Sequence, residues 1–106
     1  MMTYKIKTID INAKEYFDKI NGNSYFAAIV TINYKMKNEK TIKLQYQYGY
    51  GEHYKDITKQ ELIKQGYIKT NNEYISLWKY CNENNIILRN FKQTKCLKRE
   101  VKNFIN

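Results

Sequence analysis

Residues 24–36 predict a β-strand with apolar side chains on both of its faces. One face carries Phe26, Ala28, Val30, Ile32 and Tyr34, and the other carries Tyr25, Ala27, Ile29 and Thr31. A strand with one wet face alternates between apolar and polar residues, whereas a strand covered on both sides is apolar throughout. We therefore expect this strand at the centre of a sheet.

The remaining pattern predicts a mixture of strands and helices. Further strands are expected at residues 3–11, with a bulge near Thr8, at 41–48 and at 86–88, the last with a buried connector as the alternative. Capping signals and helical spacing predict helices at 12–20, with a loop as the alternative, and at 58–66, 70–81 and 97–105, the third of these four with Trp78 in the core. Together these elements predict one α+β domain over residues 1–106, a small antiparallel sheet with helices packed on one face.

Composition bounds the class of protein. The chain has 106 residues, 42% of them hydrophobic, which suffices for one folded core but not for two. Its formal net charge of +9 suits an acidic partner, such as nucleic acid or an acidic protein surface. No apolar stretch is long enough to cross a bilayer and the start lacks a signal region, so we expect no membrane contact and an intracellular, cytoplasmic location.

The sequence predicts a binding protein and not an enzyme. Cys81 and Cys96 have neither a CxxC spacing nor a second histidine beside them, so no metal site and no cofactor are expected. The two cysteines are expected as reduced thiols, with a disulfide as the alternative. Carboxylates occur singly, and the single histidine, His53, has no nucleophile next to it.

Residues 46–54 carry four tyrosines, two of the four glycines and the single histidine. In a continued strand Tyr46, Tyr48 and Tyr50 would share one face with Ile42 and Leu44. The rings are then either the rim of the core or exposed groups that stack on bases or anchor a protein. The candidate partner-binding residues are Tyr46, Tyr48, Tyr50, His53 and Tyr54.

Positive charge is concentrated near the C-terminus. The predicted basic patch consists of Arg89, Lys92, Lys95, Lys98, Arg99 and Lys102. Such a stripe is either the solvated outer face of a packed helix or a surface that contacts phosphates or an acidic protein. No motif for sequence-specific recognition of nucleic acid accompanies it.

Two segments resemble a known group of proteins. Residues 21–26, Asn-Gly-Asn-Ser-Tyr-Phe, and residues 47–51, Gln-Tyr-Gly-Tyr-Gly, are similar to segments of small bacteriophage and mobile-element proteins of unassigned function. The resemblance spans roughly residues 5–68. It implies a setting in which small proteins act stoichiometrically against host defence, of which anti-CRISPR proteins are the best-known class.

Two functions follow as hypotheses. The first is an anti-CRISPR-like inhibitor that binds a host defence effector, such as a CRISPR effector, or the nucleic acid of that effector, without catalysis. The second is a non-specific single-stranded nucleic-acid-binding module in which the tyrosines stack on bases and the C-terminal cations follow the phosphates. The oligomeric state stays open, including a homodimer through an exposed strand edge.

Overall fold

The computed structural model describes residues 5–72 and 74–105. Its strands are β1 (Thr8–Asp18), β2 (Asn23–Ile32), β3 (Lys40–Tyr48) and β4 (Ile87–Gln93), and its helices are α1 (His53–Lys64), α2 (Leu77–Glu83) and α3 (Lys98–Asn103). One sheet has the strand order β3-β2-β1-β4, in which β1, β2 and β3 are antiparallel and β4 runs parallel to β1. The expected central position of the strand predicted at 24–36 is confirmed, but the strand ends at Ile32 and residues 33–36 form a turn.

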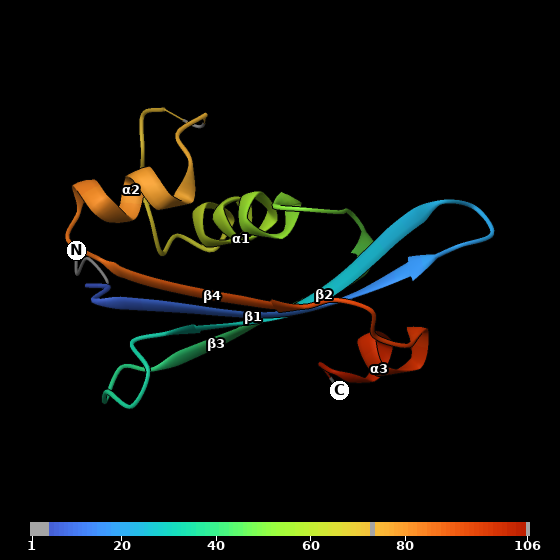
Figure 1. Cartoon of the computed structure of the whole chain (residues 1–106). Coiled ribbons are helices and arrows are strands. Elements are labelled where there is room, and N and C mark those ends of the chain that lie inside the picture. The colour runs from blue at the N-terminus through green and yellow to red at the C-terminus, as the bar shows by residue number, and fades with distance from the viewer. Residues whose placement is uncertain (1–4, 73, 106) are drawn as a thin grey trace.

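Helices lie on both faces of this sheet (Figure 1). The helices α1 and α2 cover one face over the larger core, which includes Ile9, Phe26 and Val30. The opposite face, which we call the α3 face, carries a smaller core of Ala27, Cys96, Val101 and Ile105. The α+β class is therefore confirmed, and the expected placement of the helices holds for α1 and α2, whereas α3 packs on the other side. Ala27 has a side chain small enough to let α3 approach the sheet.

The two cysteines belong to different cores. Cys81 is buried in the larger core and Cys96 in the smaller one, so the sheet separates them. Both are free thiols, as the sequence led us to expect. A disulfide between them would require the layers of the domain to come apart.

The helix predicted at 12–20 is wrong, because β1 continues to Asp18. Lys14 and Tyr16 pair in register with Ala27 and Tyr25 of β2. A tight turn then closes the hairpin, in which Asp18 Oδ1 accepts a hydrogen bond from the Ile20 backbone N–H. Pairing along a long hairpin satisfies more backbone groups than the short helix that the Asn12 capping signal suggested.

A bulge lies in β3 and not at the predicted position near Thr8. Ala28 pairs with Leu44 and Phe26 pairs with Gln47, so two residues of β3, Gln45 and Tyr46, oppose the single residue Ala27. An extra residue in one strand reverses the faces of all residues beyond it. Tyr46 therefore packs against the smaller core, while Leu44 belongs to the larger one.

The helices begin at residues other than those predicted. Thr58 does not cap α1 but lies inside it, buried, with its hydroxyl donating to the Tyr54 carbonyl at 2.8 Å. The N-terminal cap of α2 is Ser76, whose Oγ accepts a hydrogen bond from the Lys79 N–H at 3.1 Å. The capping signal at 70–73 predicted an earlier start for this helix, and residue 73 lies outside the described residues. A hydroxyl can bond within a helix as well as at its start, and the position of a Ser or Thr in the sequence does not tell which of the two it does.

Within the described part of the chain, no helix has the length and apolarity that a bilayer-spanning segment needs.

Candidate binding surface

The glycines of residues 47–51 shape the corner between β3 and α1. A Cβ atom on Gly49 would lie 2.6 Å from Cδ2 of His53 and 2.8 Å from Cε1 of Phe26, closer than atoms can pack. Gly51 has φ of +63°, a conformation that favours glycine. The His53 ring can therefore lie edge-on against Phe26, with centroids 6.3 Å apart. The glycines of this segment therefore serve the packing of α1 against β2.

The predicted partner-binding residues lie in different environments. Tyr54 is only 4% exposed and belongs to the larger core; its hydroxyl donates to Asn90 Oδ1 at 3.4 Å, and burial raises its pKa. Tyr46 is half-buried against the smaller core. Tyr48, Tyr50 and His53 are exposed. The structure therefore makes Tyr54 a core residue and leaves the other four within reach of a partner to differing degrees.

Four tyrosines gather on the α3 face, and two of them were not predicted. Tyr16, Tyr25 and Tyr48 lie side by side across β1, β2 and β3. The Tyr25 ring stacks on Tyr46 with a centroid distance of 5.3 Å and meets Tyr48 edge-on at 5.9 Å. Tyr16 lies 6.5 Å from Tyr25. We call Tyr16, Tyr25, Tyr46 and Tyr48 the tyrosine cluster.

Cations lie on the same face of the sheet as the tyrosine cluster, and one of them lies over its Tyr46 ring. The Lys102 Nζ atom of α3 lies 5.3 Å from the Tyr46 ring centroid, and the Lys14 Nζ atom of β1 lies 5.0 Å from the Phe104 centroid. Lys43 is exposed on β3 and pairs in register with Ile29, whose side chain packs against the smaller core. Aromatic rings and cations therefore share one face of the sheet.

The six residues of the predicted basic patch do not form one surface. Lys92 lies on the α1 side of β4, where its Nζ atom bonds Glu15 Oε2 at 3.0 Å and the Gly51 carbonyl at 2.8 Å. Arg89 is on the α3 face but forms a paired ionic contact with Asp10, 2.6 Å from Nε to Oδ1, which raises the Arg89 pKa. The exposed cations of the patch outside β4 are Lys95, Lys98, Arg99 and Lys102.

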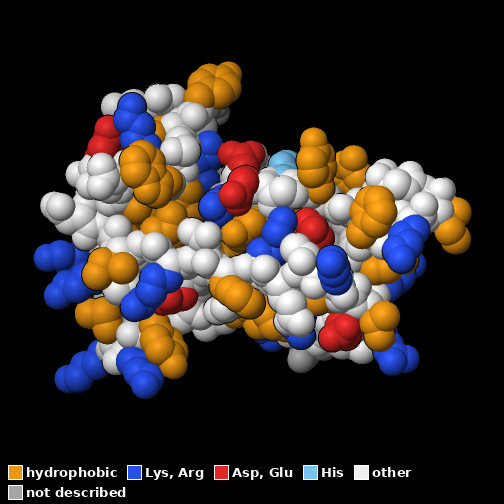
Figure 2. Space-filling model, in the orientation of Figure 1, with side chains coloured by type: hydrophobic (Ala, Val, Ile, Leu, Met, Phe, Trp, Pro, Cys, Tyr) orange, Lys and Arg blue, Asp and Glu red, His pale blue; other side chains and the backbone are white. Residues whose placement is uncertain are grey.

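Charge is also spread over the rest of the molecule. In the view of Figure 2, Lys and Arg side chains occur from the end that carries α2 to the β1–β2 hairpin, with hydrophobic groups between them. The net charge of +9 therefore does not by itself mark one binding site. Cations also lie over rings elsewhere, as Lys55 and Lys92 do at Tyr54. The feature particular to the α3 face is a set of neighbouring tyrosine rings in contact with one another, with cations on the same face.

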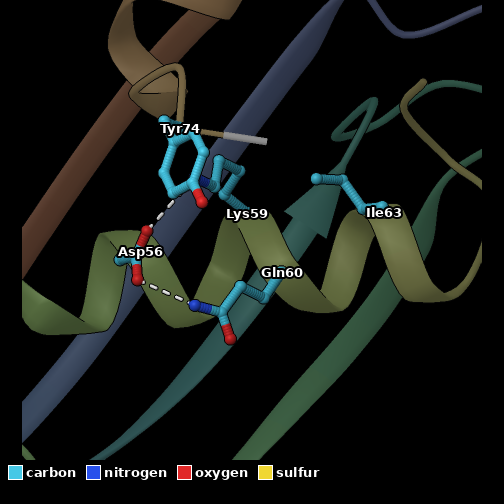
Figure 3. A pocket seen from close by; sticks show the side chains of 5 residues that line it. All are labelled: Asp56, Lys59, Gln60, Ile63 and Tyr74. Carbon is cyan, nitrogen blue, oxygen red and sulfur yellow. Dashed lines mark hydrogen bonds and ion pairs between the residues drawn. The ribbon is translucent and has the colours of Figure 1, made fainter. Parts of the chain in front are cut away.

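A pocket on the other side of the domain lies between α1 and the chain that precedes α2. It has a volume of about 550 Å³ and is lined by Asp56, Lys59, Gln60, Ile63 and Tyr74. Figure 3 shows the Tyr74 ring over the place where Asp56 and Lys59 meet. The Lys59 Nζ atom lies 3.3 Å from Asp56 Oδ1 and donates to the Ile75 carbonyl at 3.1 Å. The buried lysine thus holds this loop on α1.

Two large aromatic residues near this pocket are exposed, which corrects the expected core position of Trp78. Leu77 and Cys81 of α2 are buried, but Trp78 is 68% exposed and Tyr74 is 87% exposed. The short helix turns only one narrow stripe to the core, and Trp78 lies outside it. Exposed tryptophan and tyrosine are the residues most often found at the centre of protein interfaces.

Sequence reasoning missed the residues that complete the α3 face. Tyr16, Tyr25, Lys14 and Lys43 were not singled out, and neither were Phe91 and Phe104. The alternation of Asn12, Lys14 and Tyr16 along β1 was the available signal, because these residues share one face of a strand. Their neighbours on β2 and β4 depend on strand register, which one sequence does not reveal.

The comparisons with known proteins add no relative. A scan against protein-family models finds no match, and searches of curated proteins and of solved structures find none either. Within residues 5–72 and 74–105, no group of three His, Cys, Asp or Glu side chains could hold a metal ion. The surface itself therefore carries the evidence on function.

Proposed function

We propose that this protein binds single-stranded nucleic acid, without catalysis, through the α3 face. The observation that carries the proposal is the tyrosine cluster with Lys14, Lys43 and Lys102 on the same face. Surfaces that hold single strands combine cations that contact the backbone with aromatic rings on which bases stack. Each base offers a flat face, so such a surface requires no sequence motif.

Exposure decides which rings can stack. Tyr48 is 59% exposed and lies at the free edge of the sheet, since β3 has only β2 beside it. Tyr25 is partly covered and holds Tyr48 by the edge-on contact of 5.9 Å. A base can therefore stack on Tyr48, which Tyr25 contacts from the side, while Tyr46 stacks on Tyr25.

A titration tests this proposal. Fluorescence anisotropy of labelled single-stranded DNA and RNA at about 50 mM and about 200 mM salt measures affinity and its salt dependence. We expect micromolar or tighter binding at the lower salt that weakens steeply at the higher one. Absence of micromolar binding at the lower salt would end the proposal. A duplex of the same sequence is the control, because its bases are not available for stacking.

A second candidate is a stoichiometric inhibitor of a nucleic-acid-dependent host defence effector, the anti-CRISPR-like hypothesis. Its support is the resemblance of residues 21–26 and 47–51 together with the exposed pair Tyr74 and Trp78. These two rings lie on the side of the sheet opposite the α3 face, so one molecule could contact an effector protein and its nucleic acid together.

Co-purification with CRISPR effector complexes and a cleavage assay test this second candidate. We expect inhibition at a one-to-one ratio, weakened by Trp78→Ala and unchanged by Ile20→Ala, which removes a still more exposed apolar side chain from the β1–β2 hairpin. Full cleavage at a large excess of the protein over cognate effectors would sink the inhibitor hypothesis.

A further inference from the structure

A groove lies on the α3 face, between β1, β4 and the end of α3. Its volume is about 260 Å³, and its lining includes Asn12, Lys14, Ile29, Phe91, Gln93 and Phe104. Pockets for drug-sized ligands have volumes of roughly 300–1,000 Å³, so this groove suits a smaller group such as one planar ring system. The tyrosine cluster lies on the same face.

Aromatic rings stand on both sides of the groove. Phe91 of β4 is 62% exposed. Phe104 follows α3 and is half-buried, with the Lys14 Nζ atom 5.0 Å from its ring centroid. Ile29 of β2 contributes a further apolar contact. A flat ring can therefore stack here, with a cation within reach of an attached phosphate.

Two amide side chains provide a polar edge to the same groove. In the parallel register Asn12 pairs with Phe91 and Lys14 pairs with Gln93, so the amides lie next to the aromatic wall. Asn12 and Gln93 are exposed, and within the described residues no side-chain hydrogen bond engages either amide. Each amide presents one donor and one acceptor side by side.

We propose that this groove holds one base of the bound strand, an inference that rests on the proposed function. An asparagine or glutamine amide can form two hydrogen bonds with the edge of an unpaired base, such as N6 and N7 of adenine or O4 and N3 of uracil. Charge favours a nucleotide over an apolar peptide side chain as the occupant, because Lys14 lines the groove in a chain of net charge +9.

The experiment compares an adenylate oligomer with an abasic oligomer of equal length and follows the side-chain amides by NMR. Asn12→Ala and Gln93→Ala assign the two amide signals. We expect both signals to move on addition of AMP and to stay in place on addition of ribose 5-phosphate. The double variant should bind the adenylate oligomer about tenfold more weakly while binding to the abasic oligomer stays unchanged, and Asn82→Ala on α2 should leave both affinities unchanged.

A variant of the aromatic wall separates stacking from hydrogen bonding. Phe91→Ala should weaken binding of the adenylate oligomer by about tenfold and leave the abasic oligomer unaffected, because only a base can stack on this ring. Amide signals that stay in place on addition of AMP, with wild-type affinity of the Asn12 and Gln93 double variant for the adenylate oligomer, would overturn this inference and leave the proposed function standing. If the amide signals move on addition of indole but not of AMP, the groove takes an apolar side chain, and this result would overturn the inference too. If neither oligomer binds, the proposed function fails and the inference with it.

Discussion

The ring of Tyr25 on β2 lies against the ring of Tyr46 on β3, with planes 9° from parallel. This contact exists because the bulge at Gln45 and Tyr46 turns the end of β3 over, so that Tyr46 leaves the face of Leu44. Burial raises the pKa of Tyr46, with Tyr25 as a further cause. The stack joins the smaller core to the exposed part of the tyrosine cluster.

Tyr46 and Tyr48 should differ in their effects on stability and binding. Tyr46→Ala removes a half-buried ring from the contact with α3 and should lower the free energy of unfolding by about 1–3 kcal/mol. Tyr48→Ala removes an exposed ring and should change stability by less than about 1 kcal/mol, while single-strand binding weakens by about 1–3 kcal/mol. Urea unfolding and anisotropy measure the two effects. A large loss of stability in Tyr48→Ala would place that ring in the core and contradict the account.

The sequence was informative where side-chain alternation continued without interruption. Alternation through Val30 and Ile32 predicted β2 and its central place, and it failed at Tyr46 because a bulge leaves no mark in one sequence. The end of β1 was mistaken for a helix, since the Asn12 and Glu15 pattern suits a cap as well as a strand. Proximity in sequence places Lys92 in a surface patch, whereas its face is set by β4, of which the sequence pattern predicts only residues 86–88.

Gly49→Ala should destabilise the protein by about 1–3 kcal/mol, because the new Cβ would overlap the His53 and Phe26 rings. The double variant with His53→Ala should recover part of this loss, since one of the two rings is removed. Thermal unfolding of the single and double variants measures the coupling. If Gly49→Ala is as stable as the wild type, the close approach of α1 to β2 is not as described.

Asn33→Ala should lower the free energy of unfolding by about 2–4 kcal/mol. Asn33 is fully buried, its Oδ1 accepts from the Lys7 N–H at 2.7 Å, and its Nδ2 donates to the Lys5 carbonyl at 2.9 Å. Asn85→Ala is the matched control, since Asn85 has a similar positive φ of 56° but is exposed. Asn85→Ala should lower the free energy of unfolding by no more than about 1 kcal/mol. Equal losses in the two variants would mean that backbone conformation, and not the buried hydrogen bonds, determines the cost.

Stability should fall as the pH rises above about 9. Burial raises the pKa of the Cys81 thiol from 9.0 to about 11, so between these values the unfolded chain loses a proton that the folded protein keeps. The raised pKa values of Tyr46 and Tyr54 act in the same direction at higher pH. Cys81→Ala should show a smaller loss of unfolding free energy between pH 9 and pH 11 than the wild type. Parallel pH profiles for the two proteins would contradict the burial of this thiol.

Salt dependence of single-strand binding tests the central claim, that the α3 face holds a phosphate backbone. Two double variants remove the same charge from opposite sides, Lys14→Ala with Lys43→Ala on the α3 face and Lys64→Ala with Lys79→Ala on the helices α1 and α2. Each phosphate contact contributes about 0.7 to the slope of log affinity against log salt for a single strand. We expect the first variant to lose about 1.4 from this slope and the second to keep the wild-type value. Equal slopes in both variants would show that the α3 face is not where the strand binds.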